Sequence, residues 1–224
     1  MGKVLLKSKN FEYLRSEKQF LKLNNMNRIT IPLISVFNPG YVNRKNGRTV
    51  MQCHPYKEAS LTEIYDYIRG PKAQSQTAAL RAEPNEKKQS LMKLETLKYC
   101  TPFGTFSYRN EKGLLSRSGM MVTDIDDVAD PVTLASLREA LKGDPRYVTE
   151  LLFTSPRGHG LKWFIRVGDM DGMALKDYFR RVSRYIQFEY GIVIDESGKD
   201  VARACYLSHD PDCYINPEYI ISIA

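Results

Sequence analysis

Apolar and polar residues follow two different periods along this chain. Continuous or alternating runs of β-branched and aromatic residues predict strands, and apolar residues at helical spacing predict helices. The strands are expected at 28–37, 120–128, 147–155 and 161–167, with a short run at 192–195 that ends at Asp195. The helices are expected at 83–99 and 172–191, the second one ending at Gly191.

Capping signals add two more helices. The stretch 60–63, Ser-Leu-Thr-Glu, is a capping box that begins a helix through Ile68, and Gly70-Pro71 ends it. Asp130-Pro131 combines an N-cap with proline at the first helical position, which predicts a helix to Lys142. Mixed strands and helices of this kind predict an α+β or α/β sheet protein.

The length of 224 residues favours one domain, from 28 to 224, preceded by a polar arm over 1–27. No apolar run is long enough to span a membrane, and the lysine-rich start lacks the apolar core of a signal peptide, so we expect a cytoplasmic protein. The net charge of +7 is spread along the chain and favours a polyanionic partner, for which nucleic acid is the usual example.

The four cysteines are too few and too scattered for a disulfide framework. Cys205, His209 and Cys213 form a C-x3-H-x3-C string that could supply three zinc ligands. That spacing matches no common zinc motif, so we expect buried or free thiols there.

Two carboxylates near the end of the predicted strand 120–128 are candidates for chemistry. Side chains alternate across a strand, so Asp124 and Asp126 lie on one face and Asp127 on the other. Because two adjacent carboxylates repel, something positive must hold both of them ionised, and a divalent cation does this well. Asp195 is the candidate third ligand of a two-ion site. The alternative is that these residues cap helices or lie solvated at turns.

A second candidate is the loop "SPRGHGLK" between the predicted strands 147–155 and 161–167. Gly158 and Gly160 allow a tight turn with exposed amide donors, and Ser155, Arg157 and Lys162 could reach the oxygens of a triphosphate. A plain hairpin turn, with His159 exposed at its tip, is the alternative.

The segment 195–216 supplies more basic residues. If 201–206 is helical or turn-like, Arg203 can swing back over the Asp195 end of the sheet and bind phosphate with two nitrogens. A structural ion pair with Asp195 or Asp200 is equally compatible with the spacing. His209 follows in the same segment and joins the candidate nucleotide-binding residues.

Three stretches together resemble the archaeo-eukaryotic primase, or primase-polymerase, superfamily. They are "SGMMVTDIDDV", "TSPRGHGLKWFIRV" and "DESGKDVARACYLSHDPDCYINP". More closely, they resemble the VirE N-terminal-like domain of bacterial mobile elements, which is commonly found upstream of a helicase-type ATPase. The resemblance covers the chain from about residue 28, and its N-terminal third is looser.

The resemblance implies an RNA-recognition-like antiparallel sheet with flanking helices, joined to a smaller α/β module. It implies a DNA-directed nucleotidyltransferase that acts on a template and primer with nucleoside triphosphates during mobile-element replication. By motif position, Asp124, Asp126 and Asp195 would be catalytic and hold two Mg²⁺ or Mn²⁺ ions. The nucleotide-binding set would comprise Ser155, Arg157, Gly158, His159, Gly160, Lys162, Arg203 and His209.

One position departs from the pattern of the superfamily. Active members usually carry histidine where this chain has Lys162, and lysine can give charge to a phosphate but cannot hydrogen-bond in the same way. A non-catalytic nucleic-acid-binding module that recruits a helicase or other replication proteins is therefore a second hypothesis. A metal-dependent nuclease or phosphohydrolase that uses the same carboxylates is a third.

Overall fold

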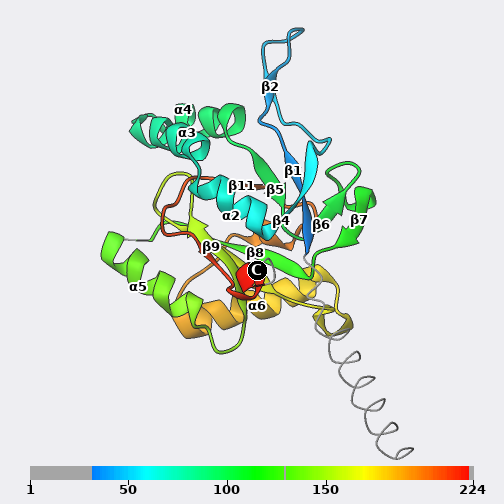
Figure 1. Ribbon diagram of the computed structural model, residues 1–224, viewed down its shortest axis with the longest axis vertical. Helices are drawn as coiled ribbons and strands as arrows, with labels where there is room; N and C mark the ends of the chain where they lie inside the picture. Colours follow the sequence, from blue (N-terminus) through cyan, green and yellow to red (C-terminus); the bar gives the residue numbers. More distant parts are fainter. Residues whose placement is uncertain (1–31, 129, 222–224) are drawn as a thin grey trace, which may run out of the picture. The chain divides into compact units, whose positions relative to one another are not determined.

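The computed structural model describes residues 32–128 and 130–221. The predicted arm at 1–27 and the first residues of the predicted strand 28–37 lie outside this part of the chain. The chain divides into units of 1–31 and 32–224, and all described residues belong to the second unit. Figure 1 shows strands and helices mixed along its length, so the α+β prediction is confirmed.

Two four-stranded antiparallel sheets form the framework. The first sheet has the order β11 (Cys205–Tyr206), β5 (Tyr99–Thr101), β1 (Leu33–Phe37) and β4 (Lys57–Ser60). The second has the order β12 (Tyr214–Ile215), β9 (Thr149–Thr154), β10 (Leu161–Arg166) and β8 (Met120–Ile125). The predicted hairpin is the β9–β10 pair at the centre of the second sheet.

Six helices and two small hairpins complete the described part of the chain. The helices are α2 (Leu61–Arg69), α3 (Pro71–Ala82), α4 (Glu86–Thr96), α5 (Pro131–Lys142), α6 (Leu175–Tyr190) and α7 (Glu218–Ile221). The hairpins pair β2 (Tyr41–Val42) with β3 (Thr49–Val50), and β6 (Gly104–Phe106) with β7 (Leu114–Arg117). Short 3-10 turns cover Glu111–Gly113, Met170–Gly172 and Glu196–Lys199. No helix in the described residues is both long enough and apolar enough to cross a membrane.

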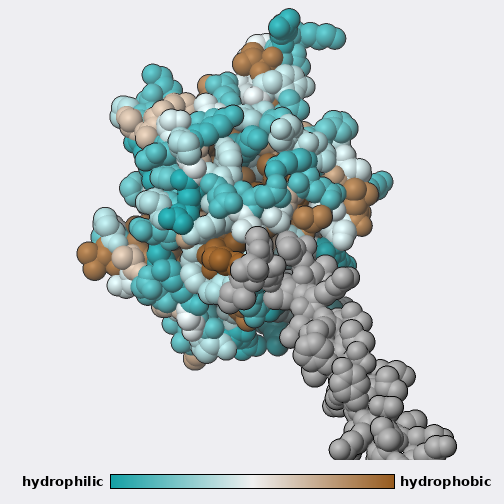
Figure 2. Space-filling model, viewed as in Figure 1, coloured by the Kyte–Doolittle hydropathy of each residue, from teal (hydrophilic) through white to brown (hydrophobic). Residues whose placement is uncertain are grey.

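The second sheet separates two apolar cores. One face packs on α5 and α6 around Trp163, which is fully buried and donates its indole N–H to the Thr149 hydroxyl at 2.7 Å. The other face packs on α2 and the first sheet through residues such as Val122 and Phe164. The face of the molecule in Figure 2 is mostly hydrophilic with separate apolar patches, as expected when apolar residues fill two cores.

The local signals succeed where a cap is present. Ser60 and Glu63 form the predicted capping box of α2, Asp130 caps α5 through the amides of Val132 and Thr133, and Gly191 ends α6 at a φ of 68°. Each of these three helices therefore begins or ends where its cap chemistry requires.

The structure adds one helix that was not expected and corrects two expected elements. Gly70-Pro71 does end α2, but Pro71 also occupies the first turn of α3, a helix that the sequence pattern did not suggest. The predicted helix 83–99 is shorter, because α4 stops at Thr96 and Tyr99 already belongs to β5. The predicted strand at 192–195 is not a strand, although the Asp195 amide donates to the Asp124 carbonyl at 3.3 Å.

Candidate functional site

The site begins with a charged pair fixed by sheet register. Lys162 of β10 lies directly opposite Asp124 of β8, and both side chains continue the face that Val122 and Phe164 present to the first sheet. The Lys162 ammonium lies 2.7 Å from Asp124 Oδ1, and the two residues are only 8% and 3% exposed. The face between the sheets is thus apolar along its length and becomes charged at its end.

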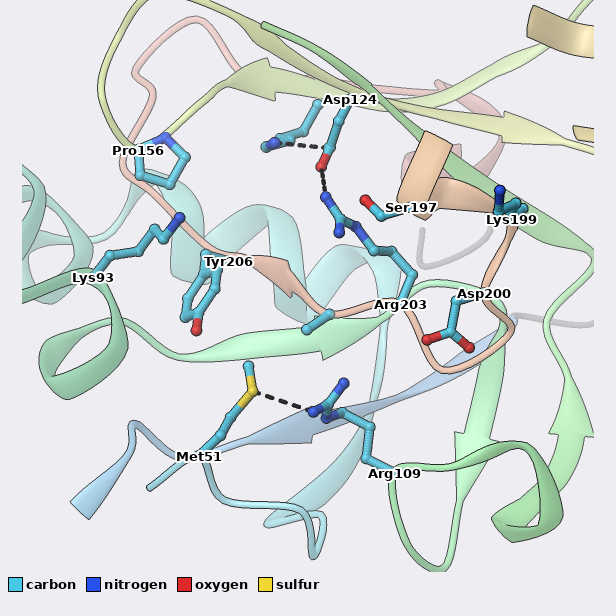
Figure 3. Close-up of a pocket in the computed structure, with 12 residues that line it drawn as sticks. Met51, Lys93, Arg109, Asp124, Pro156, Ser197, Lys199, Asp200, Arg203 and Tyr206 are labelled. Carbon is cyan, nitrogen blue, oxygen red and sulfur yellow. Dashed lines mark hydrogen bonds and ion pairs between the residues drawn. The ribbon is translucent and has the colours of Figure 1, made fainter. Parts of the chain in front are cut away.

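Arg203 joins a second carboxylate to this pair. It follows a turn closed by its own amide on the Asp200 carbonyl, and one guanidinium nitrogen, Nη2, reaches Asp124 Oδ2 at 2.5 Å and Asp195 Oδ2 at 2.9 Å. Figure 3 shows the Arg203 side chain directed toward Asp124. Arg203 therefore lies over the Asp195 end of the sheet, as expected for a turn-like segment.

The remaining carboxylates are more open. Asp126 lies beyond the end of β8, its side chain is 52% exposed, and its Oδ1 is 3.8 Å from the Lys162 ammonium. Asp195 accepts from the Ser197 amide at 2.9 Å and the Ser197 hydroxyl at 2.5 Å. The structure therefore brings Asp124, Asp126 and Asp195 around the same two cations, while Asp127 takes a left-handed turn with a φ of 55°.

The charges stabilise one another. Burial lowers the pKa of Lys162, but the neighbouring groups, Asp124 first among them and Asp126 with it, together outweigh burial and leave that pKa above its ordinary value. The pKa of Arg203 is raised in the same way, against burial, by Asp124 and Asp195. Burial raises the pKa of Asp195, yet the Ser197 hydrogen bonds and Arg203 leave it below its usual range. The positive partner that the paired carboxylates require is thus supplied by the chain itself.

The carboxylates as arranged do not fit a pair of metal ions. Asp124 faces Lys162 with one oxygen and Arg203 with the other, and both Asp195 oxygens accept hydrogen bonds from Ser197. Among residues 32–128 and 130–221, no group of three or more His, Cys, Asp or Glu residues could hold a metal ion. The Mg²⁺ or Mn²⁺ site stays a prediction.

The glycine loop is a tight turn that Arg81 of α3 holds in place. The Gly158 amide donates to the Ser155 carbonyl at 3.0 Å, so it is not the open donor for phosphate that the loop sequence predicts, and the Ser155 amide donates to the Gly160 carbonyl at 2.8 Å. A Cβ at Gly160 would lie 2.1 Å from the Ile125 carbonyl oxygen, which explains this glycine. Arg81 of α3 donates to the Ser155 and Pro156 carbonyls at 3.0 and 3.1 Å and anchors the loop.

Two adjoining cavities of about 370 and 410 Å³ meet at the charged cluster. The first cavity and the second cavity share Lys93, Asp124, Pro156, Lys162 and Arg203. The first is lined further by Met51, Arg109, Ser197, Lys199, Asp200, Ala204 and Tyr206. The second is lined further by Asp126, Asp127, Ser155, Arg157, His159 and Asp195. Together they form one cleft.

The two cavities differ in charge. Five cationic side chains and two carboxylates line the first, whereas cationic and acidic residues balance in the second. Figure 3 shows Lys93, Arg109 and Arg203 reaching the first cavity from three different segments of the chain. A cavity with this excess of positive charge suits a polyanion such as a phosphate chain.

Residues 92–215 match the family model described as BT4734-like, N-terminal domain. This match spans more than half of the chain. The protein belongs to the BT4734-like N-terminal domain family. The matched region contains Asp124, the glycine loop, Lys162 and Arg203, while α2 and α3 lie before it.

Two further comparisons add little to the family assignment. No curated protein matches this member of the family. A solved structure, the polymerase domain from Mycobacterium tuberculosis Ligase D in complex with DNA, matches at 14% identity with a TM-score of 0.30. That match covers 53% of this chain and 49% of the other, so the chain spans about half the length of that structure. A likeness at this level does not establish a shared fold.

The predicted nucleotide-binding residues divide into two groups in this family member. Ser155, Arg157, His159, Lys162 and Arg203 line the cleft, although Arg157 already donates to the Ser90 hydroxyl at 2.9 Å. Gly158 and Gly160 line neither cavity. Neither does His209. Its Nδ1 lies 2.8 Å from the Ile68 carbonyl oxygen at the end of α2, and its amide donates to the Thr77 hydroxyl.

Lys93 and Arg109 line the first cavity but were not among the predicted residues. Lys93 lies on α4, and its ammonium is 5.2 Å from the centre of the Tyr206 ring inside the cleft. Burial lowers its pKa, and the nearby charges of Arg157 and Lys162 lower it further. The sequence motifs do not predict Lys93 or Arg109, because α4 and the segment after β6 approach the cleft only in the folded structure.

Proposed function

We propose that this protein binds the phosphates of a nucleoside triphosphate in the first cavity and transfers the nucleotide to a DNA primer, as a nucleotidyltransferase of the primase-polymerase type. The observation that carries the proposal is the excess of cationic side chains around the buried Asp124–Lys162–Arg203 cluster. Arg203, Arg109 and Lys93 each contribute positive charge for the phosphate oxygens.

The second cavity suits the other reactant. In the transfer, the primer hydroxyl oxygen bonds to the α-phosphorus, the bond to pyrophosphate breaks, and the hydroxyl proton needs an acceptor. Asp126 is the most open carboxylate of the cluster and is the proposed acceptor. The motif resemblance implies a pair of metal ions at the carboxylates, but these residues as arranged do not fit one, and no part of the step is assigned to an ion. The resemblance also suggests a role in mobile-element replication, beside a helicase-type ATPase.

Nucleotide binding by purified full-length protein tests the first part of the proposal. Arg203→Met should weaken binding of a fluorescent nucleoside triphosphate by at least about tenfold, because it removes a cation from the middle of the cleft. Lys87→Met is the matched control, since Lys87 is an exposed cation on α4 that lines neither cavity. Equal affinities for wild type and Arg203→Met would contradict the proposal.

Incorporation of labelled nucleotide into a primed DNA template tests the second part. Wild type should give product, and an Asp124→Ala/Asp126→Ala double variant should give none. The second candidate function is a nucleic-acid-binding module without transfer activity, which recruits other replication proteins. It is favoured by one observation, that both Asp124 oxygens already face cations of the chain. It predicts salt-dependent DNA binding by both proteins and product from neither.

A further inference from the structure

We infer that Lys162 occupies the position of a divalent cation between Asp124 and Asp126, and that nucleotide phosphates therefore bind to this cleft without a metal ion. The nucleotide half of this inference rests on the proposed function, whereas the exclusion of a metal ion does not. Three features of the cluster support it: the placement of the Lys162 ammonium, its rigidity, and the balance of charge.

The Lys162 ammonium bridges the two carboxylates as an ion would. It lies 2.7 Å from Asp124 Oδ1 and 3.8 Å from Asp126 Oδ1. Magnesium must approach a carboxylate oxygen to about 2.1 Å and keeps nearly octahedral surroundings. An ammonium at hydrogen-bonding distance from the same oxygen occupies that approach, so the lysine and an ion exclude each other at Asp124.

Strand pairing in the sheet fixes the position of Lys162. Lys162 is on a central strand, paired with Asp124 on one side and with Phe153 of β9 on the other, so the root of its side chain is fixed. The side chain is nine-tenths buried and cannot swing freely into solvent. Arg203 closes the other oxygen of Asp124 from a different segment. A flexible surface lysine would yield to an ion more readily than this one.

The charges also balance without a metal ion. Lys162 and Arg203 together carry the charge of one divalent ion, and both contact Asp124. An additional divalent ion at this point would face two fixed positive charges within a poorly solvated cluster, where repulsion is only weakly screened. Lys93 and Arg109 leave the first cavity with further positive charge for phosphate. A phosphate chain thus finds its counter-charges already in place.

Manganese binding to the full-length protein, followed by the electron paramagnetic resonance signal of free Mn²⁺, tests the exclusion directly. Wild type should leave the signal unchanged in the absence of nucleotide. Lys162→Met, which keeps the length of the side chain and removes its charge, should bind Mn²⁺ at least about tenfold more tightly. Adding Asp126→Asn to that variant should remove the gain, and Lys87→Met should behave as wild type.

The wild-type protein alone keeps the inference falsifiable. If wild type binds Mn²⁺ as tightly as Lys162→Met does, the inference is overturned. The same holds if Lys162→Met remains folded, as judged by circular dichroism, and gains no Mn²⁺ binding. If that variant fails to fold, the wild-type titration decides, because tight Mn²⁺ binding at the cluster is incompatible with a lysine in the position of the ion.

Nucleotide affinity then separates this inference from the proposed function. Wild type should bind a fluorescent nucleoside triphosphate in EDTA within about threefold of its affinity in Mn²⁺, and Lys162→Met should bind it only with Mn²⁺. A strict metal requirement in wild type overturns the inference and leaves the proposed function standing. Absence of nucleotide binding under every condition overturns the proposed function, and the Mn²⁺ titration still decides the role of Lys162.

Discussion

Two aspartates in this protein are equally buried but differ in how completely they are hydrogen-bonded. Asp124 and Asp210 are each 3% exposed, and each contacts an arginine. Asp210 Oδ2 accepts hydrogen bonds from Arg138 at 2.7 Å, from the Thr154 amide at 2.7 Å and from the Thr154 hydroxyl at 2.9 Å. Its Oδ1 accepts a hydrogen bond from the Asp212 amide. The acceptor capacity of this carboxylate is used entirely within the fold.

The cluster around Asp124 is less complete. Asp124 Oδ1 lies close to the Lys162 ammonium but receives no hydrogen bond of good geometry, and Arg203 Nε is buried without a partner among the described residues. Both belong to residues that line the cleft, which Arg138 and Asp210 do not. A closed, satisfied ion pair stabilises the fold, whereas an ion-pair cluster with unsatisfied groups beside a cavity marks a candidate binding site.

The largest effect on stability is expected at the closed pair. Arg138→Met should lower the free energy of unfolding by about 3–5 kcal/mol, because it leaves the buried Asp210 charge without its partner. Urea denaturation measures the loss. Lys142→Met on the same helix is the control, since the exposed Lys142–Glu139 pair should contribute less than about 1 kcal/mol. Equal losses from the two variants would show that Asp210 is not held by Arg138.

A smaller effect is expected from pH, and its sign differs between the two clusters. Burial raises the pKa of Asp210, but Arg138 and the Thr154 hydrogen bonds leave it below the ordinary value. Its contribution to stability is therefore complete above about pH 3.9 and is lost as pH falls through the folded pKa. The pKa of Lys162 is raised, so its contribution is complete below about pH 10.4 and is lost as pH rises further.

Denaturation at several pH values checks both signs. Asp210→Asn should flatten the acid side of the stability profile and leave the alkaline side unchanged, while Lys162→Met should do the reverse. The acid effect should be smaller than that of Arg138→Met, because protonated Asp210 keeps its Thr154 partners. An alkaline slope that persists in Lys162→Met would place the titrating group elsewhere.

The sequence predicts the strand-borne parts of this site better than the helix-borne parts. Register and alternation place Asp124 and Lys162 on one face, because a strand fixes the direction of every second side chain. The tight turn of the loop is also predicted locally, because its glycines allow the backbone to turn. Arg203 and Asp195 are found by spacing and motif, although the segment before Asp195 is not the expected strand.

Residues that reach the cleft from distant segments leave no such local signal. Arg81 anchors the glycine loop from α3, a helix with weak apolar periodicity that the pattern missed. His209 follows Arg203 closely in sequence, yet its ring faces the end of α2. Two residues that are close in sequence share a site only when the backbone between them keeps one direction. The turns around β11 change that direction.

The smallest structural effect is expected at Lys93, where function and stability should separate. Lys93 forms no ion pair with a described carboxylate, and its substitution removes only its contact with the Tyr206 ring, so Lys93→Met should change the unfolding free energy by less than about 1 kcal/mol. Nucleotide affinity should still fall about tenfold, because a cation of the first cavity is lost. Lys87→Met controls for the loss of one positive charge on α4. Unchanged affinity in Lys93→Met would place the phosphates outside the first cavity, and a large loss of stability would mean that Lys93, like Arg138, holds the fold together.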